Sequence, residues 1–101
     1  MMRPLKGSER RQLRKLAHHL EPIVFVGKSG VTDSVIEATN QALEAHELIK
    51  VKFIEFKKEK KELAAEIERR TESAVAGIVG SVAILYREQE DEAKRKIQLG
   101  E

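Results

Sequence analysis

One short segment, Gly27-Lys28-Ser29-Gly30, constrains the fold of this chain more than any other. It directly follows the apolar run 23–26, which is typical of a buried strand, and it directly precedes a helix predicted to begin near Thr32. Glycines let the backbone turn sharply and approach a ligand closely, and the start of a helix attracts anions. The segment therefore suits a phosphate, although an ordinary tight turn explains the same four residues equally well.

The run Gly27-Lys28-Ser29 also matches the end of a Walker A motif, which holds the phosphates of a nucleoside triphosphate. That motif requires another glycine five residues before Gly27, and Pro22 occupies this position. The residues between them have the pattern of a strand and not of a phosphate-wrapping loop. No Gly-x-Gly-x-x-Gly fingerprint occurs elsewhere, so nucleotide binding is disfavoured.

Length and composition narrow the class of protein. A chain of 101 residues is expected to form one domain with a single modest core. It has no cysteine, so it contains neither a disulfide nor a thiolate site. No apolar run approaches the roughly 18–20 residues that span a bilayer, and residues 1–6 lack the apolar segment of a secretory signal. We therefore expect a cytoplasmic protein with no membrane contact.

The charged residues are distributed unevenly along the chain. The formal net charge is only +2, but basic residues outnumber acidic ones in residues 1–30 and again in 50–61. The segment 31–49 between them carries acidic charges alone, apart from its histidine. Separated basic blocks allow a mildly charged chain to present a basic face to a polyanion.

The first basic block coincides with a predicted helix that begins at Ser8, a good N-cap, and ends before Pro22. Leu13, Leu16, Ala17 and Leu20 have the spacing of its buried face. Like charges four residues apart repel each other, and a helix that tolerates such a stripe gives mild evidence of contact with a polyanion. For a lone basic helix, however, a solvated face is the favoured explanation. The stripe consists of Arg10, Arg11, Arg14 and Lys15.

The remaining elements alternate. Thr32 is predicted to cap a helix that runs to His46, a strand follows over 49–53, and a third helix covers about 58–70. Two strands, 74–79 and 82–86, flank a turn at Gly80. The highly charged residues 88–101 are expected to form a frayed helix or a mobile tail. The fold class is thus α/β (α+β): a compact two-layer sandwich in the order α-β-α-β-α-β-β with a four-stranded mixed sheet.

No constellation of side chains supports catalysis or metal binding. Each of the histidines 18, 19 and 46 lies near the predicted end of a helix, where its charge complements the helix dipole. They lack the spacing and the acidic partners of a metal site. Asp33 and Glu37 lie on one helix, where a first-turn acid is explained by capping. The chain is predicted to be no enzyme and to need no metal or cofactor.

The four aromatic residues bear on the mode of nucleic-acid recognition. Phe25 and Phe53 occur within apolar strand patterns and are predicted to lie in the core. Domains that stack single-stranded bases need several exposed rings. With so few aromatic residues, recognition of the backbone and shape of a nucleic acid fits this chain better.

Four motifs occur in order along the chain: LRKLAHHLEP at 13–22, VGKSGVT at 26–32, HELIKVK at 46–52, and IVG at 78–80 followed by VAILYR at 82–87. Together they closely resemble the CRM domain, named for chloroplast RNA splicing and ribosome maturation. The resemblance spans residues 5–87 and is to the stand-alone bacterial YhbY type, with 88–101 as a charged C-terminal tail. Two positions depart from the usual family pattern, Glu72 for a glycine and Gly77 for a glutamine, and neither is in the glycine loop.

The resemblance implies a single RNA-binding domain whose fold is similar to the C-terminal domain of a bacterial translation initiation factor. It also implies a role on precursors of the large ribosomal subunit, with which bacterial members are linked. The family's Gly-x-x-Gly loop, compared with the loop by which KH domains clamp the nucleotide backbone, carries over onto Gly27, Lys28 and Gly30.

We therefore predict a non-enzymatic assembly factor that binds 23S rRNA or its precursor in the pre-50S particle. Lys50 and Lys52 are weaker candidates, because the sequence does not tell which face of the sheet is open. The rival hypothesis is an adaptor that binds an acidic ribosomal or assembly protein through the same basic residues. The predicted contact residues are Gly27, Lys28, Ser29 and Gly30 of the loop with Arg10, Arg11, Arg14 and Lys15 of the first helix.

Overall fold

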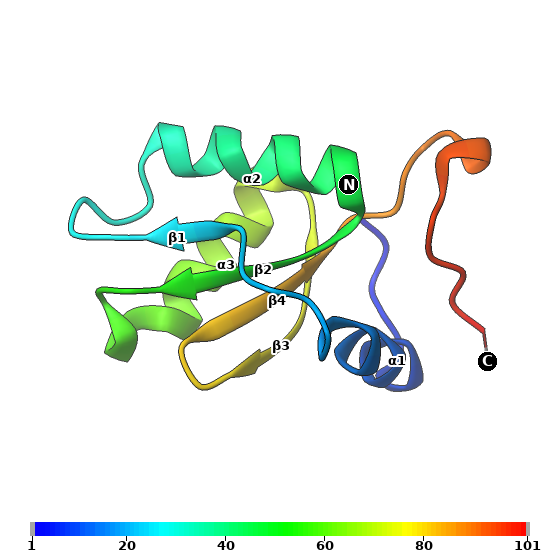
Figure 1. Ribbon diagram of the computed structural model, residues 1–101, viewed down its shortest axis with the longest axis horizontal. Coiled ribbons are helices and arrows are strands. Elements are labelled where there is room, and N and C mark those ends of the chain that lie inside the picture. Colours follow the sequence, from blue (N-terminus) through cyan, green and yellow to red (C-terminus); the bar gives the residue numbers. More distant parts are fainter. Residues whose placement is uncertain (1, 101) are drawn as a thin grey trace.

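The computed structural model describes residues 2–100 and has the predicted order of elements (Figure 1). None of the helices in this part of the chain is long and apolar enough to cross a membrane. The elements are α1 (Gly7–Ala17), β1 (Val24–Val26), α2 (Asp33–His46), β2 (Leu48–Phe53), the 3-10 helix η1 (Lys57–Glu59), α3 (Lys60–Thr71), β3 (Ala74–Val79), β4 (Val82–Tyr86) and the 3-10 helix η2 (Glu92–Lys94).

The four strands form one mixed sheet in the spatial order β1-β2-β4-β3, which confirms the predicted fold class. β1 and β2 are parallel and are joined by the crossover helix α2, whereas β4 pairs antiparallel with both β2 and β3. The register sets Phe25 beside Lys52 and Lys52 beside Val82. Because adjacent partners in a sheet point to the same face, these three side chains share one face.

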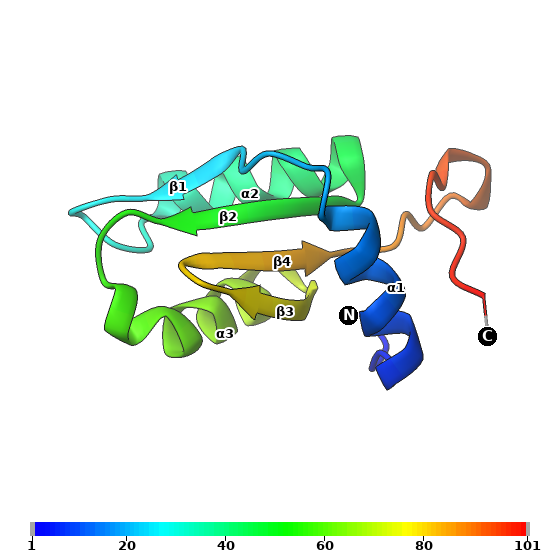
Figure 2. The same cartoon turned by 60° about the horizontal axis from the view of Figure 1, so that its bottom comes forward.

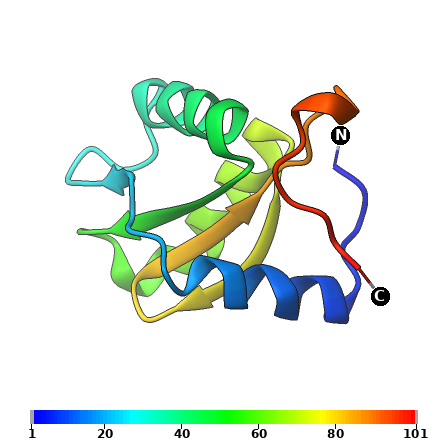
Figure 3. The same ribbon diagram turned by 45° about the vertical axis from the view of Figure 1, so that its right-hand side comes forward.

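The helices cover the two faces of the sheet unequally (Figure 3). α2 and α3 together cover one face, and α1 lies on the other, at one end of the sheet (Figure 2). The sheet and the paired helices α2 and α3 thus form two layers. α1 packs on the second face of the sheet at one end and leaves the other end of that face uncovered. The core under α2 and α3 contains Val24, Val26, Ile36, Leu43, Ile49, Val51, Phe53, Ala64, Ile67, Ala83 and Leu85, and the core under α1 contains Leu5, Leu13, Ala17, Leu48, Ala76, Ile84 and Tyr86.

The start of α1 differs from the prediction. Its N-cap is Lys6, whose N–H donates to Oε1 of Glu9 at 2.9 Å, and Ser8 lies inside the helix, so the predicted Ser8 cap is wrong. Arg3 donates two further hydrogen bonds to the same carboxylate, so Glu9 and not a serine hydroxyl accepts from the backbone at the helix start.

The buried face of α1 is narrower than predicted. Leu13 and Ala17 are completely buried, but Leu16 and Leu20 are exposed, so half of the predicted apolar face is wrong. The reason is that the helix ends at Ala17 and touches only the end of the sheet, so that it buries a narrow stripe.

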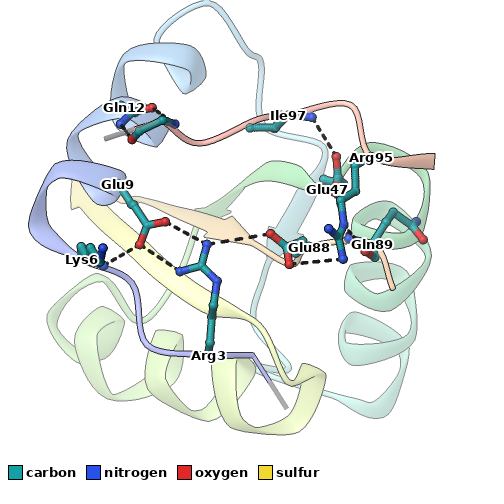
Figure 4. A network of polar contacts seen from close by, with 10 residues as sticks. Arg3, Lys6, Glu9, Gln12, Glu47, Glu88, Gln89, Arg95 and Ile97 are labelled. Atoms are coloured by element: carbon teal, nitrogen blue, oxygen red, sulfur yellow. Dashed lines mark hydrogen bonds and ion pairs between the residues drawn. The ribbon is translucent and has the colours of Figure 1, made fainter. Parts of the chain in front are cut away.

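The C-terminal segment 88–100 is held against the domain by polar contacts (Figure 4). The buried carboxylate of Glu47 accepts hydrogen bonds from the N–H groups of Gln89, Lys96 and Ile97, at 2.9, 2.5 and 3.1 Å. Gln12 of α1 exchanges two hydrogen bonds with the backbone of Gly100. Where the sequence predicts a frayed helix or a mobile tail, the segment contains the 3-10 helix η2 and returns to the surface of α1.

Candidate nucleic-acid interface

The segment Gly27–Gly30 forms a tight turn between β1 and α2. The N–H of Gly30 donates to the carbonyl of Gly27 at 3.0 Å, and Gly30 has a φ of +73°, in the left-handed region that favours glycine. Oγ1 of Thr32 accepts a hydrogen bond from the N–H of Val35 at 3.1 Å, which confirms Thr32 as the N-cap of α2. The sequence thus places an exposed turn directly before a helix start.

The turn lies at one extremity of the molecule, at the left of Figure 1, and is open to a ligand. Lys28 and Ser29 are exposed, and a Cβ added to Gly27 would meet no atom within 4 Å. Asp33, the first residue of α2, is also exposed, and its carboxylate accepts a hydrogen bond from Arg70 at 2.7 Å. That ion pair offsets an acidic charge that would otherwise repel an anion at the helix start.

A second segment lies beside the turn because β1 and β2 are parallel and end at the same edge. The carbonyl of Val26 accepts the N–H groups of Ile54 and Glu55, at 2.9 and 3.2 Å, which joins the segment after β2 to the start of the turn. The residues that follow share a shallow hollow with Lys28. Two of them, Lys57 and Lys58, add positive charge that our sequence prediction did not include, although both belong to the second basic block.

The basic residues of α1 are not brought to this turn. α1 and the turn lie toward opposite ends of the long axis of the molecule, which extends over 38 Å (Figures 1 and 2). Arg11, Arg14 and Lys15 line their own shallow hollow with His18 and His19. The structure therefore divides the predicted site into two separate basic regions: the loop region, with Lys28, Lys57 and Lys58, and the helix region, with Arg11, Arg14 and Lys15.

Two of the four predicted α1 residues have intramolecular partners. The guanidinium of Arg10 donates to the carbonyl of Leu5 at 2.9 Å, and that of Arg14 donates to the carbonyl of Ala76 at 3.0 Å. The stem of Arg14 runs over Gly77, where a Cβ would come 2.7 Å from Cδ of the arginine. The glycine at position 77, a departure from the usual family pattern, thus gives the Arg14 side chain room that a residue with a Cβ would take unless the arginine shifted.

The aromatic residues are only partly where the sequence predicted them. Phe53 is completely buried, as predicted, but Phe25 is 52% exposed, so its assignment to the core is wrong. β1 is buried on one face alone, because α1 does not extend over its other face. Phe56 is exposed as well, at 42%, whereas burial of Tyr86 raises the pKa of its phenol to about 12.

The structure distinguishes the two lysines of β2. Nζ of Lys50 donates to the carbonyl of Leu20 at 2.9 Å, which directs it toward the end of the sheet that α1 covers. Lys52 is half-buried beside Phe25, on the open part of the face.

Between residues 2 and 100, no group of three or more His, Cys, Asp or Glu side chains could hold a metal ion.

These features define a small α+β domain with an exposed, lysine-bearing glycine turn between a parallel strand and a helix. The chain belongs to the CRS1/YhbY (CRM) domain family, whose model matches residues 5–87. This match confirms the resemblance carried by the four sequence motifs.

Related proteins and one solved structure align with most of the chain. A protein of Bacillus subtilis named a probable RNA-binding protein is 39% identical over 88 residues, which are 86% of this chain and 92% of that protein. A Haemophilus influenzae protein named an RNA-binding protein is 39% identical over 99 residues, 97% of both chains. The solution structure of a Staphylococcus aureus protein superposes with a TM-score of 0.83 at 36% identity, covering 96% of this chain and 100% of that one.

Proposed function

We propose that this chain is an RNA-binding assembly factor that acts in the cytoplasm on the precursor of the large ribosomal subunit (pre-50S), where it contacts 23S rRNA or its precursor. The observation that carries the proposal is the exposed turn Gly27–Gly30, with Lys28 on it and Lys57 and Lys58 beside it. The names of the relatives support RNA as the ligand. The resemblance to the YhbY type supports the ribosomal target.

The loop region would bind the sugar-phosphate backbone. Gly27 has no neighbour within 4 Å of a Cβ position, so a phosphate group can approach the main chain closely there. The start of α2 supplies N–H groups and the positive end of a helix dipole, and Ser29 adds a hydroxyl donor. Lys28 supplies a charge with no intramolecular partner among the described residues, so it is available for a phosphate.

The helix region would form a second, separate contact with the same RNA. Arg11 and Lys15 are exposed and have no polar partner among residues 2–100, so they are the strongest candidates in this region. Arg10 and Arg14 retain donors for a phosphate beyond those used by Leu5 and Ala76. Because the two regions lie toward opposite ends of the molecule, one folded RNA or two neighbouring RNA segments would have to reach both.

Crosslinking in cells, followed by sequencing of the bound RNA, tests this proposal. The wild-type protein is expected to recover 23S rRNA or its precursor and to migrate with pre-50S particles in a sucrose gradient. A Lys28→Ala/Arg11→Ala variant is expected to lose both signals while retaining its fold. Recovery of an acidic ribosomal protein after ribonuclease treatment, with no enrichment of rRNA, would overturn the proposal in favour of the adaptor hypothesis.

A further inference from the structure

Two exposed aromatic rings flank the glycine turn. Phe25, on β1, is 52% exposed and lies two residues before Gly27. Phe56, in the segment after β2, is 42% exposed. Exposure of a large ring to water is unfavourable, so two such rings beside one turn point to a surface that is covered when a ligand is bound.

Phe25 lies on the open part of the sheet. Its neighbours Val24 and Val26 are buried under α2 and α3, so the alternation of the strand turns Phe25 to the face that α1 leaves uncovered at this end (Figure 2). The register places Lys52 next to it and Val82 beyond. The ring of Phe25 thus lies beside the charged side chain of Lys52 on an exposed part of the sheet.

Phe56 lies against the turn itself. Its φ of +57° is in the left-handed region, which a bulky residue adopts only when the surrounding structure holds it there. Cε2 of its ring would be 3.7 Å from a Cβ at Gly30, which places the ring in contact with the turn. The charged residues that line the same hollow are three lysines and two glutamates: Lys28, Lys57, Lys58, Glu55 and Glu59.

We propose that Phe25 and Phe56 are stacking platforms for unpaired nucleobases of the RNA whose backbone the turn holds. This proposal rests on the proposed function and adds the class of ligand, a single-stranded segment. Aromatic rings stack on any base, and cations beside them pair with the phosphates of the same nucleotides. An apolar protein segment would cover the rings but would leave the lysines beside them unpaired, whereas a nucleotide strand complements both the rings and the excess of lysines over glutamates around them.

A duplex would not use these rings. Its bases are stacked on each other and reach a protein only through groove edges and the backbone. The proposal therefore predicts a preference for unpaired RNA, in contrast to the backbone-only recognition expected from the small number of aromatic residues. Removal of a ring should reduce binding of single strands and leave duplex binding nearly unchanged.

The test uses the full chain and two RNAs, a single-stranded oligonucleotide and the same sequence annealed to its complement. Dissociation constants are measured for wild type, Phe25→Leu and Phe56→Leu at several salt concentrations. Leucine retains apolar bulk, so the fold should survive, and melting temperatures verify this. Each variant is expected to bind the single strand about five-fold or more weakly, with an unchanged salt slope. Leu16→Ala, which removes a similarly exposed apolar side chain from α1, is the matched control and should bind as wild type does.

The outcomes separate this proposal from the proposed function. If Lys28→Ala weakens binding of both RNAs but neither leucine variant changes the affinity for single strands, RNA binding stands and the stacking platforms are overturned. If only one leucine variant weakens binding, the platform at the other ring is overturned. If the wild-type protein binds neither RNA with a higher affinity than it binds a control anion such as heparin, the proposed function fails, and the stacking proposal fails with it.

Discussion

The side chain of Arg14 lies across the backbone of Gly77, so closely that a Cβ there would come within 2.7 Å of Cδ and 3.3 Å of Cγ of the arginine. The guanidinium reaches past the glycine to the carbonyl of Ala76. β3 has a register irregularity between Val75 and Gly77, and the carbonyl that accepts from the arginine belongs to Ala76, the residue between them. Arg14 therefore joins α1 to β3, and substitution of this residue alters more than the basic surface.

This contact predicts a reversal in a double-mutant cycle. Gly77→Ala in the wild-type background should displace Arg14 and lower the free energy of unfolding by about 1 kcal/mol, the usual worth of a lost hydrogen bond. In an Arg14→Ala background the same change meets no obstacle, and it should be neutral or stabilising because alanine restricts the unfolded chain. Urea denaturation of the four proteins measures both effects. Equal costs of Gly77→Ala in the two backgrounds would contradict the contact.

The Glu9 carboxylate should make stability depend on pH in the acid range. Its hydrogen bonds from the Arg3 guanidinium and then from the Lys6 N–H lower its pKa to about 2. A pKa lowered by folding contributes stability above its ordinary value of 4.5, and this contribution is lost as the pH falls from there toward 2. Glu9→Gln should therefore melt at a lower temperature than wild type at pH 7, and the difference should vanish near pH 2. A difference that is constant with pH would exclude this role.

The Glu47 carboxylate should hold the C-terminal segment in place. Glu47→Gln replaces one acceptor oxygen with a donor and removes the charge, so at least one of the three N–H groups loses its partner. We expect the free energy of unfolding to fall by about 2 kcal/mol and amide hydrogen exchange at Lys96 and Ile97 to accelerate. Glu44→Gln, at a neighbouring exposed carboxylate, is the matched control. Unchanged exchange at both amides would contradict the role of Glu47.

The two glycines of the turn should respond differently to alanine. Gly30→Ala forces a left-handed φ on a residue with a Cβ and should lower the free energy of unfolding by about 1 kcal/mol. Gly27→Ala meets no neighbouring atom and should leave stability unchanged, yet its Cβ would occupy the approach of a phosphate and weaken RNA binding. Thermal melts and binding isotherms of both variants test this. Gly27→Ala with wild-type affinity would exclude close approach of RNA at that residue.

The sequence predicts the order of elements well because each has its own local signal. The turn glycines, the Thr32 cap and the alternation of Lys50 and Lys52 with apolar residues all act within a few residues, and the structure agrees with them. The local pattern that predicts Ser8 as the N-cap fails because the carboxylate of Glu9 accepts the N–H of Lys6 instead. Arg3, which lies outside the helix, holds that carboxylate in place.

The errors concern features that depend on packing between elements. Phe25 was predicted to be buried because the sequence does not tell how far α1 extends over the sheet. For the same reason the sequence does not show that the basic stripe of α1 lies away from the turn, where Arg14 packs over Gly77 of β3. The proximity of Lys57 to the turn follows from the parallel pairing of β1 and β2, which has no local sequence signal.

The central claim, that the turn binds an RNA backbone through Lys28, is tested most directly by the salt dependence of binding. Dissociation constants for a single-stranded rRNA fragment are measured across salt concentrations for wild type, Lys28→Ala and the matched control Lys94→Ala, which removes an exposed lysine of η2. One lost phosphate contact should make the log–log slope of Lys28→Ala shallower by about 0.7, with the control as steep as wild type. Equal slopes for all three proteins would contradict the account.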